Sequence, residues 1–151
     1  MAGLGRHNIE YRDNTNKILE LLQGAKRRGF EAIGLAAEGH AKKKITAEGA
    51  VDTGRLRNSI TYALAGEETH VKQYRGYKKG QGEEKRGVYS YEGVAPEKKG
   101  EGVYIGTNVE YAPGIELGTN RSAGAVHFLQ DAANGHTAEY KRLMEDSMKN
   151  A

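Results

Sequence analysis

The chain has 151 residues, with 23 Lys and Arg, 20 Asp and Glu, and neither Cys nor Trp. The lack of Cys excludes a disulfide scaffold, a Cys-ligated metal site and a thiol nucleophile. A net charge of +3 is too small for the self-repulsion of a disordered chain, and the composition predicts one soluble cytosolic domain over residues 1–151, with a thin core because only 37% of the residues are hydrophobic.

The N-terminal region, residues 1–13, is predicted to be flexible. It has no apolar stretch of signal-peptide length, and the chain has no apolar run long enough to cross a membrane, so we expect neither secretion by that route nor a membrane partner. Asp13 and Thr15 then supply N-cap chemistry, and apolar residues begin to recur at helical spacing. This pattern predicts one long helix over residues 15–44.

The predicted helix has two faces of different composition. Apolar and small residues form a stripe that we expect to be buried: Ile18, Leu21, Leu22, Ala25, Gly29, Ala32, Ile33, Ala36 and His40. Charged residues form the opposite face, which we expect to be solvated: Glu20, Arg27, Glu31, Glu38 and Lys42. Several glycines lower the helix propensity, so packing has to hold this helix in place.

A short turn and several strands are expected in the middle of the chain. Asp52 or Thr53 can cap the turn, and residues 60–65 alternate with the period of a half-buried strand. We expect further strands at residues 69–74, 88–94 and 103–107.

Two segments between these strands are predicted to be exposed. Residues 76–87 are rich in Gly and Lys and too polar for a core, which predicts a mobile hairpin tip or insertion. Residues 95–102 have the composition of a second exposed turn. We hypothesise that the hairpin at residues 74–88 becomes ordered against a partner.

Helices are expected again at the C-terminal end. Residues 111–118 place Pro near the start of a short helix and Gly just after its end. Residues 126–148 carry an apolar stripe at helical spacing, which predicts a C-terminal helix. The order of elements predicts an α+β fold, in which the long N-terminal helix and the C-terminal helix pack on an antiparallel sheet of about four strands, with the short helix before the C-terminal one.

One tripeptide resembles a catalytic motif. Asp52-Thr53-Gly54 matches the tripeptide that presents one carboxylate of an aspartic-protease pair. The residues before it do not form a buried apolar strand, and Arg55 follows it, so we favour a helix-capping turn. A dimeric aspartic protease that uses Asp52 is kept as an alternative.

The His residues show no metal-binding spacing. They form no i,i+4 pair and no His-x-His, and we interpret His40 and His136 as hydrogen-bonded packing residues. We therefore predict no catalytic residue, no metal site and no cofactor.

Basic residues form short clusters along the chain. They are Lys26-Arg27-Arg28, Lys42-Lys43-Lys44, Arg55 with Arg57, and the segment 72–86, which also holds Tyr74 and Tyr77. Basic and aromatic side chains on a hairpin can hold a nucleic-acid backbone and stack on bases. Glu83 and Glu84 interrupt the segment, so we favour a solvated loop, with a small basic nucleic-acid-binding protein as an alternative.

Four blocks of sequence together carry a family resemblance. They are residues 51–60 (VDTGRLRNSI), 104–113 (YIGTNVEYAP), 115–119 (IELGT) and 128–132 (FLQDA), with a predicted helix before the first and after the last. In this order and spacing the chain resembles the small head-tail joining, or tail-completion, proteins of long-tailed double-stranded DNA bacteriophages.

The resemblance implies a non-enzymatic virion assembly protein of tail-terminator type. Such a protein forms an oligomeric ring, commonly a hexamer, at the neck or tail end of the virion, after synthesis in the host cytoplasm. Its expected partners are further copies of itself, the tail tube protein and a head-side connector or stopper protein, with possible non-specific contact to passing DNA.

The resemblance and the basic-aromatic pattern together suggest residues for the subunit or partner interface. Glu116 is expected either to form an ion pair between subunits or to be simply exposed. The full set of expected interface residues is Arg55, Arg57, Tyr74, Tyr77, Lys78, Lys79, Tyr111, Glu116 and Thr119.

Overall fold

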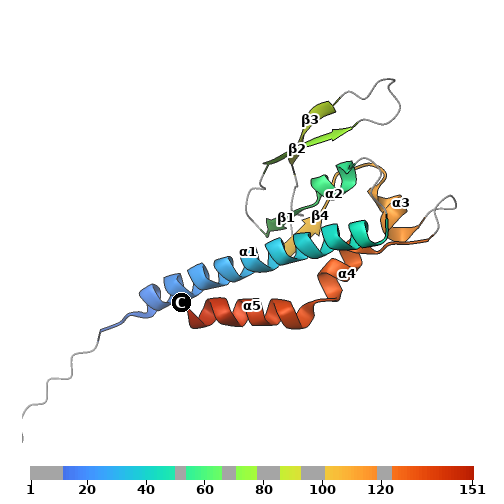
Figure 1. Cartoon of the computed structure of the whole chain (residues 1–151). Helices are drawn as coiled ribbons and strands as arrows, with labels where there is room; N and C mark the ends of the chain where they lie inside the picture. Colours follow the sequence, from blue (N-terminus) through green and yellow to red (C-terminus); the bar gives the residue numbers. More distant parts are fainter. Residues whose placement is uncertain (1–11, 50–53, 66–70, 78–85, 93–100, 119–123) are drawn as a thin grey trace, which may run out of the picture.

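The computed structural model describes residues 12–49, 54–65, 71–77, 86–92, 101–118 and 124–151. Their elements, in chain order, are α1 (Thr15–Ala47), α2 (Arg55–Ser59), β1 (Thr61–Leu64), β2 (Val71–Tyr77), β3 (Arg86–Glu92), β4 (Val103–Gly106), α3 (Ala112–Leu117), α4 (Phe128–Asn134) and α5 (Thr137–Lys149) (Figure 1). The mixture of helices and antiparallel strands, with a long first helix, confirms the predicted α+β class.

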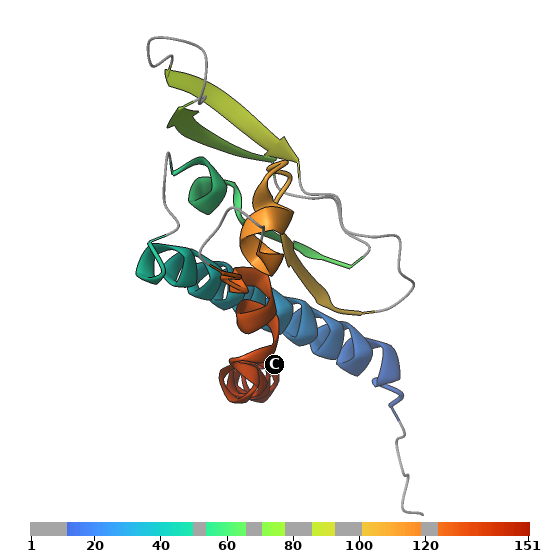
Figure 2. The same cartoon turned by 90° about the vertical axis from the view of Figure 1, so that its right-hand side faces the viewer.

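Helix α1 is the central element, with the strands, α2 and α3 on one side and α4 and α5 on the other (Figure 1 and Figure 2). Its 33 residues extend over about 50 Å at the usual rise per residue. Glycines allow close approach on both sides, because a Cβ at Gly34 would overlap the Tyr62 ring of β1 and a Cβ at Gly29 would overlap the Met144 side chain of α5. The predicted helix is therefore confirmed, and two layers hold it rather than one.

The two covered sides correct the predicted distribution of burial along α1. Ile18, Leu21 and Leu22, which we expected to be buried, are exposed. Glu38, which we expected on the solvated face, is only 7% exposed and accepts a 2.6 Å hydrogen bond from Lys42. The prediction was wrong because a single stripe suits a helix with one neighbour, whereas α1 has α5 on one side and β1 with β4 on the other.

The strands form two separate two-stranded antiparallel sheets within the described residues, not one sheet of about four. β1 pairs with β4, with Thr61 opposite Gly106 and Leu64 opposite Val103. β2 pairs with β3 as a hairpin that contacts α2. The four strand positions were predicted, but the expected single sheet was wrong, because side-chain alternation specifies the buried face of a strand and not its neighbours.

The C-terminal region also differs from the prediction. The expected single helix over residues 126–148 is divided at Gly135 and His136 into α4 and α5. α5 packs against α1 on the side away from the strands, and not on a sheet as predicted (Figure 2). The apolar stripe continues through the break, so its periodicity gives no sign of the change in direction. The short helix expected at residues 111–118 is confirmed as α3.

The core lies where α1, α2, α3, α4 and the β1–β4 pair meet. Phe128, Ile45 and Ile60 are its largest fully buried apolar side chains. The complete buried cluster is Ala41, Ile45, Leu56, Ile60, Val109, Ala112, Phe128 and Ala132. Small residues make up much of it, in agreement with the predicted thin core. Within the described residues, no helix is both long and apolar enough to span a membrane.

Candidate functional site

The blocks that carry the family resemblance come together in the fold. Ser59, at the end of α2, donates to the carbonyl of Leu56 and lies 2.6 Å from the hydroxyl of Thr107. Thr107 Oγ1 in turn accepts a 3.2 Å hydrogen bond from the backbone N–H of Val109. Because Ser59 uses its own proton on Leu56, the Thr107 hydroxyl donates to Ser59, and this chain fixes the β4–α3 loop against α2.

Arg55 links α2 to the same β4–α3 loop at the surface of the protein. Its guanidinium donates two hydrogen bonds of 2.9 Å to the carboxylate oxygens of Glu110 and lies 5.9 Å from the centroid of the Tyr111 ring. A bidentate pair with a cation–π contact is a well-oriented arrangement of the guanidinium. The predicted interface residues Arg55 and Tyr111 thus form one surface, in which Tyr111 is 40% exposed.

Glu116 has a role within the chain that sequence did not indicate. Its two carboxylate oxygens accept hydrogen bonds of 2.8 and 2.9 Å from the backbone N–H groups of Leu129 and Gln130. These are N–H groups in the first turn of α4, which lack partners within the helix. His127, the N-cap residue, has φ 53° and makes no side-chain cap. Glu116 therefore caps α4 and joins it to α3.

The other expected interface residues are placed only in part. Arg57 is half-buried in α2. Tyr74 and Tyr77 are in β2, where Tyr74 pairs with Tyr89 and Tyr77 with Arg86. Lys78, Lys79 and Thr119 lie outside the described residues, as do Asp52 and Thr53 of the Asp-Thr-Gly tripeptide, and α2 begins at Arg55 with Gly54 as its N-cap residue.

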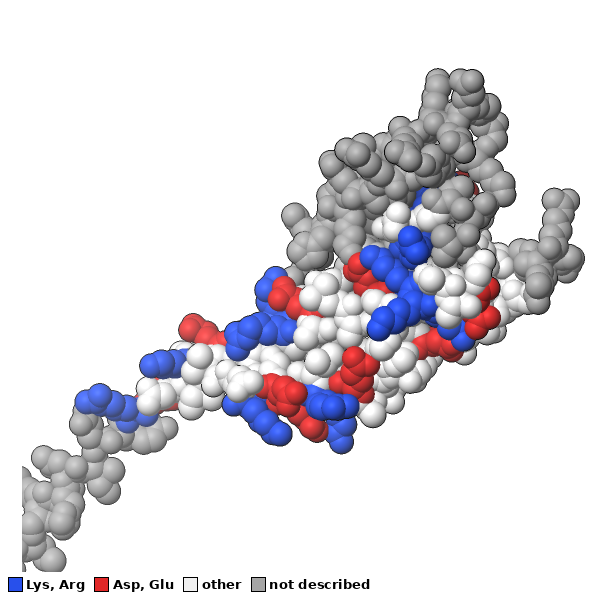
Figure 3. All heavy atoms as spheres, in the orientation of Figure 1, with Lys and Arg blue, Asp and Glu red and all other residues white. Residues whose placement is uncertain are grey.

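The basic clusters that the structure describes are largely paired with acidic groups. Lys26 Nζ lies 2.6 Å from Glu101 Oε1, and Arg27 Nη1 lies 3.0 Å from Glu31 Oε1. Lys44 Nζ lies 3.0 Å from Oδ2 of Asp131 in α4. Hydrogen bonds to Asp131 and then to Glu48 raise the pKa of Lys44 above its usual value. Positive and negative side chains are interspersed on the face shown in Figure 3.

An exposed apolar surface occupies the N-terminal end of α1. All residues from Thr15 to Gln23, which we call the α1 tip, are exposed. Four of them are large aliphatic residues, between 39% and 53% exposed: Ile18, Leu19, Leu21 and Leu22. The sequence held a sign of this surface, because large aliphatic residues gather in the tip, whereas Ala and Gly dominate where α1 is closely packed.

The α1 tip continues the surface that α5 covers. Ala25 is fully buried and its carbonyl accepts a hydrogen bond from Ser147, while Gly29 faces Met144. Ile18 and Leu22 lie on the same helical stripe as Ala25 and Gly29. Because α5 ends at Lys149, the part of the stripe in the α1 tip extends past the end of α5.

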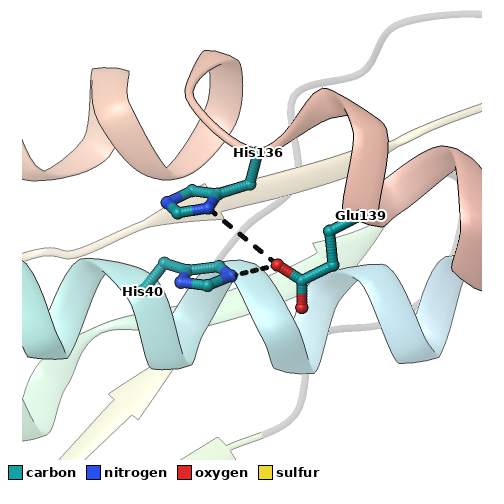
Figure 4. Close-up of side chains that lie close together, drawn as sticks. All are labelled: His40, His136 and Glu139. Atoms are coloured by element: carbon teal, nitrogen blue, oxygen red, sulfur yellow. Dashed lines mark hydrogen bonds and ion pairs between the residues drawn. The ribbon is translucent and has the colours of Figure 1, made fainter.

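His40 of α1 lies close to His136 and Glu139 at the start of α5, and these residues form a further contact between the two helices (Figure 4). The rings of His40 and His136 are stacked with centroids 3.5 Å apart and an interplanar angle of 5°. His40 Nε2 lies 2.6 Å from Glu139 Oε2. Tyr140 lies beside both rings, and burial, followed by the charge of Glu139, raises the pKa of its phenol.

We interpreted His40 and His136 as hydrogen-bonded packing residues. Their rings pack on each other and His40 forms a hydrogen bond, but the sequence did not indicate Glu139 as its partner. His40 and Glu139 are 99 positions apart, which no spacing rule covers. The i,i+3 spacing of His136 and Glu139 was the available sequence sign.

We compared the chain with models of known protein families, with curated protein sequences and with solved structures, and none of them matches.

Proposed function

We propose that this protein is a non-enzymatic assembly protein of a long-tailed bacteriophage, which joins head to tail or completes the tail as a tail-terminator-type ring at the neck. The ring would lie between the connector and the tail tube. The proposal rests on the four resembling sequence blocks and on one structural observation, the exposed α1 tip.

The α1 tip supports self-association. The apolar end of α1 projects beyond α5. Leaving it in water is unfavourable, because burial of each aliphatic side chain lowers the free energy. Continuity with the α1–α5 surface favours a helix of a second copy as the occupant, seated where α5 would continue. The thin core fits the same account, since burial between copies adds stability.

The paired basic clusters favour assembly over the nucleic-acid alternative. Lys26, Arg27 and Lys44 each lie within ion-pair distance of a carboxylate, so phosphate groups would have to displace partners already present. Contact with DNA passing through a ring is compatible with this arrangement, but a protein whose role is DNA binding usually presents a continuous positive surface.

Electron microscopy tests the proposal directly. The concentrated protein is imaged alone and after mixing with tails or heads purified from the phage that encodes it. We expect rings, or new density that caps the tail or fills the neck. Small particles that bind neither structure, together with DNA affinity that falls steeply with salt, would replace the proposal by the nucleic-acid alternative.

Substitution of the α1 tip tests the surface itself. We expect the double variant Ile18→Lys, Leu22→Lys to keep the circular dichroism of the wild type and to lose the rings. Leu35→Lys is the matched control, because Leu35 is 59% exposed on the same helix but away from the tip. Rings in the double variant, with the abundance seen in the control, would exclude the tip as the subunit interface.

Asp52→Asn addresses the protease alternative. We expect this variant to assemble as the wild type does, because the proposed role uses no carboxylate chemistry at this position. Peptide cleavage by the wild type that Asp52→Asn abolishes would favour the dimeric protease instead.

A further inference from the structure

Two imidazoles and one carboxylate converge between α1 and α5. His40 comes from the middle of α1, His136 from the N-cap of α5 and Glu139 from the first turn of α5. One ligand atom of each residue lies within 4.8 Å of those of the other two. Figure 4 shows the carboxylate at one edge of the stacked rings, facing a nitrogen of each.

The charge of this group favours a cation. Glu139 Oε2 lies 2.6 Å from His40 Nε2 and 3.9 Å from His136 Nδ1. Among the described residues, no Lys or Arg forms an ion pair with Glu139. The group therefore offers one negative charge and two imidazoles, and each of the three side chains is half-buried, which weakens the competition from water.

The donor set identifies the class of cation. Two imidazole nitrogens and one carboxylate oxygen suit Zn²⁺ and other divalent transition metals, whereas Mg²⁺ and Ca²⁺ prefer oxygen ligands. We propose that His40, His136 and Glu139 form a binding site for a divalent transition-metal ion of the Zn²⁺ class, which ties α5 to α1. The site is independent of ring assembly, and its test does not depend on the proposed function.

The stacked rings describe the metal-free arrangement. Ligand atoms of a tetrahedral Zn²⁺ site, with Zn–N near 2.0 Å, are separated by about 3.3 Å. His136 Nδ1 and Glu139 Oε2 are 3.9 Å apart, so these two atoms must come closer together when an ion binds. Parallel rings also direct their nitrogen lone pairs side by side, so one ring turns about its χ2 angle when the ion binds. Rotation about χ2 of His has a broad, shallow energy profile.

The arrangement around the ion explains what the site does. Three protein ligands leave the fourth tetrahedral position open to water. Because one ligand is on α1 and two are on α5, the ion bridges the two helices. An ion that binds only the folded form raises the melting temperature as its concentration increases.

Titration with Zn²⁺ and Co²⁺ tests the site on tag-free protein. We expect calorimetry to give one Zn²⁺ per chain, and Co²⁺ to give the visible absorption of a tetrahedral complex. Zn²⁺ should also raise the melting temperature. Glu139→Gln and His136→Asn should each lower the Zn²⁺ affinity at least about tenfold and remove the thermal shift.

The variants are chosen so that a loss of Zn²⁺ binding can be distinguished from a loss of folding. His136→Asn preserves an N-cap residue, so α5 should still begin normally, and circular dichroism checks this. Glu145→Gln is the matched control for Glu139→Gln, because Glu145 is an exposed carboxylate on the same helix that pairs with Lys141. Zn²⁺ affinity equal in the wild type, Glu139→Gln and His136→Asn would overturn the proposal, as would an absence of binding to the wild type.

Discussion

Gly34 shows how one residue sets the distance between two layers. The helix passes so close to β1 that a Cβ at this position would overlap the Tyr62 ring near its attachment, where the ring has little room to move. Gly39 is on the same helix, but a Cβ there would meet nothing within 4 Å. The two glycines therefore have opposite consequences for stability.

We predict that Gly34→Ala lowers the free energy of unfolding by about 1 to 3 kcal/mol, because the overpacking exceeds the gain in helix propensity. Gly39→Ala should raise it, by up to about 1 kcal/mol, because only the propensity changes. Denaturant unfolding of the two variants measures both. Equal effects of the same sign would show that α1 does not approach β1 as closely as described.

Glu116 provides the second prediction at this scale. Glu116→Ala leaves two N–H groups of α4 without their carboxylate, and we expect a loss of about 1 to 2 kcal/mol in the free energy of unfolding. Glu116→Gln keeps one acceptor oxygen and should lose less. Glu145→Ala, at an exposed carboxylate, should stay within about 0.5 kcal/mol of the wild type. A Glu116→Ala variant as stable as this control would contradict the cap.

Among the elements, α1 and α4 are joined by an ion pair. Lys44 of α1 pairs with Asp131 of α4, and this pair raises the pKa of Lys44 above 10.5. A raised pKa in the folded state means that the pair stabilises the fold in full below 10.5, and that this contribution is lost as the pH rises through the folded value.

We therefore predict that Lys44→Gln lowers the denaturation midpoint at neutral pH and that its difference from the wild type disappears well above pH 10.5. Lys43→Gln is the matched control, because Lys43 is the exposed neighbour on the same helix, and it should change the midpoint little at either pH. A Lys44→Gln deficit that persists at high pH would show that packing, not charge, causes it.

The elements also show what sequence could predict. Helix α1, α3 and the positions of the strands follow from local periodicity and from Pro and Gly at helix ends, which are properties of neighbouring residues. The break at Gly135 and the pairing of β1 with β4 were not predicted, because both depend on contacts between distant parts of the chain. Glu38 was misplaced for the same reason: its burial comes from a second layer, which the α1 sequence alone does not reveal.

The candidate sites divide in the same way. Arg55 and Tyr111 were predicted as interface residues from the sequence blocks that contain them. They lie together because these blocks meet in the fold. The group of His40, His136 and Glu139 was missed, since its members meet only when α5 lies along α1. A site that the tertiary fold creates leaves only a weak trace in local spacing.

At the scale of the whole molecule, the fold separates into a core and a hairpin. The described buried cluster around Phe128 is formed by residues from 41–60 and from 109–132. The β2–β3 hairpin projects from the core beside α2 (Figure 1). At the base of this segment the chain returns to its starting point, because Ala65 N–H donates a 3.0 Å hydrogen bond to the carbonyl of Gly102 and Leu64 pairs with Val103.

This geometry allows the hairpin to be removed cleanly. A variant in which Asn-Gly replaces residues 66–101 would join Ala65 to Gly102 through a two-residue turn suited to an antiparallel pair. We predict that it retains helical circular dichroism and cooperative unfolding. The ion pair of Lys26 with Glu101 is lost, at the small cost of an exposed pair.

The same variant separates folding from joining. If the hairpin becomes ordered against a neck partner, the shortened protein should still form rings through the α1 tip but should not restore infectious particles to a phage that lacks the wild-type protein. Restored infectivity would show that the hairpin is dispensable for joining. Loss of cooperative unfolding would show instead that β2 and β3 belong to the core, because removal of a peripheral hairpin leaves the buried cluster around Phe128 intact.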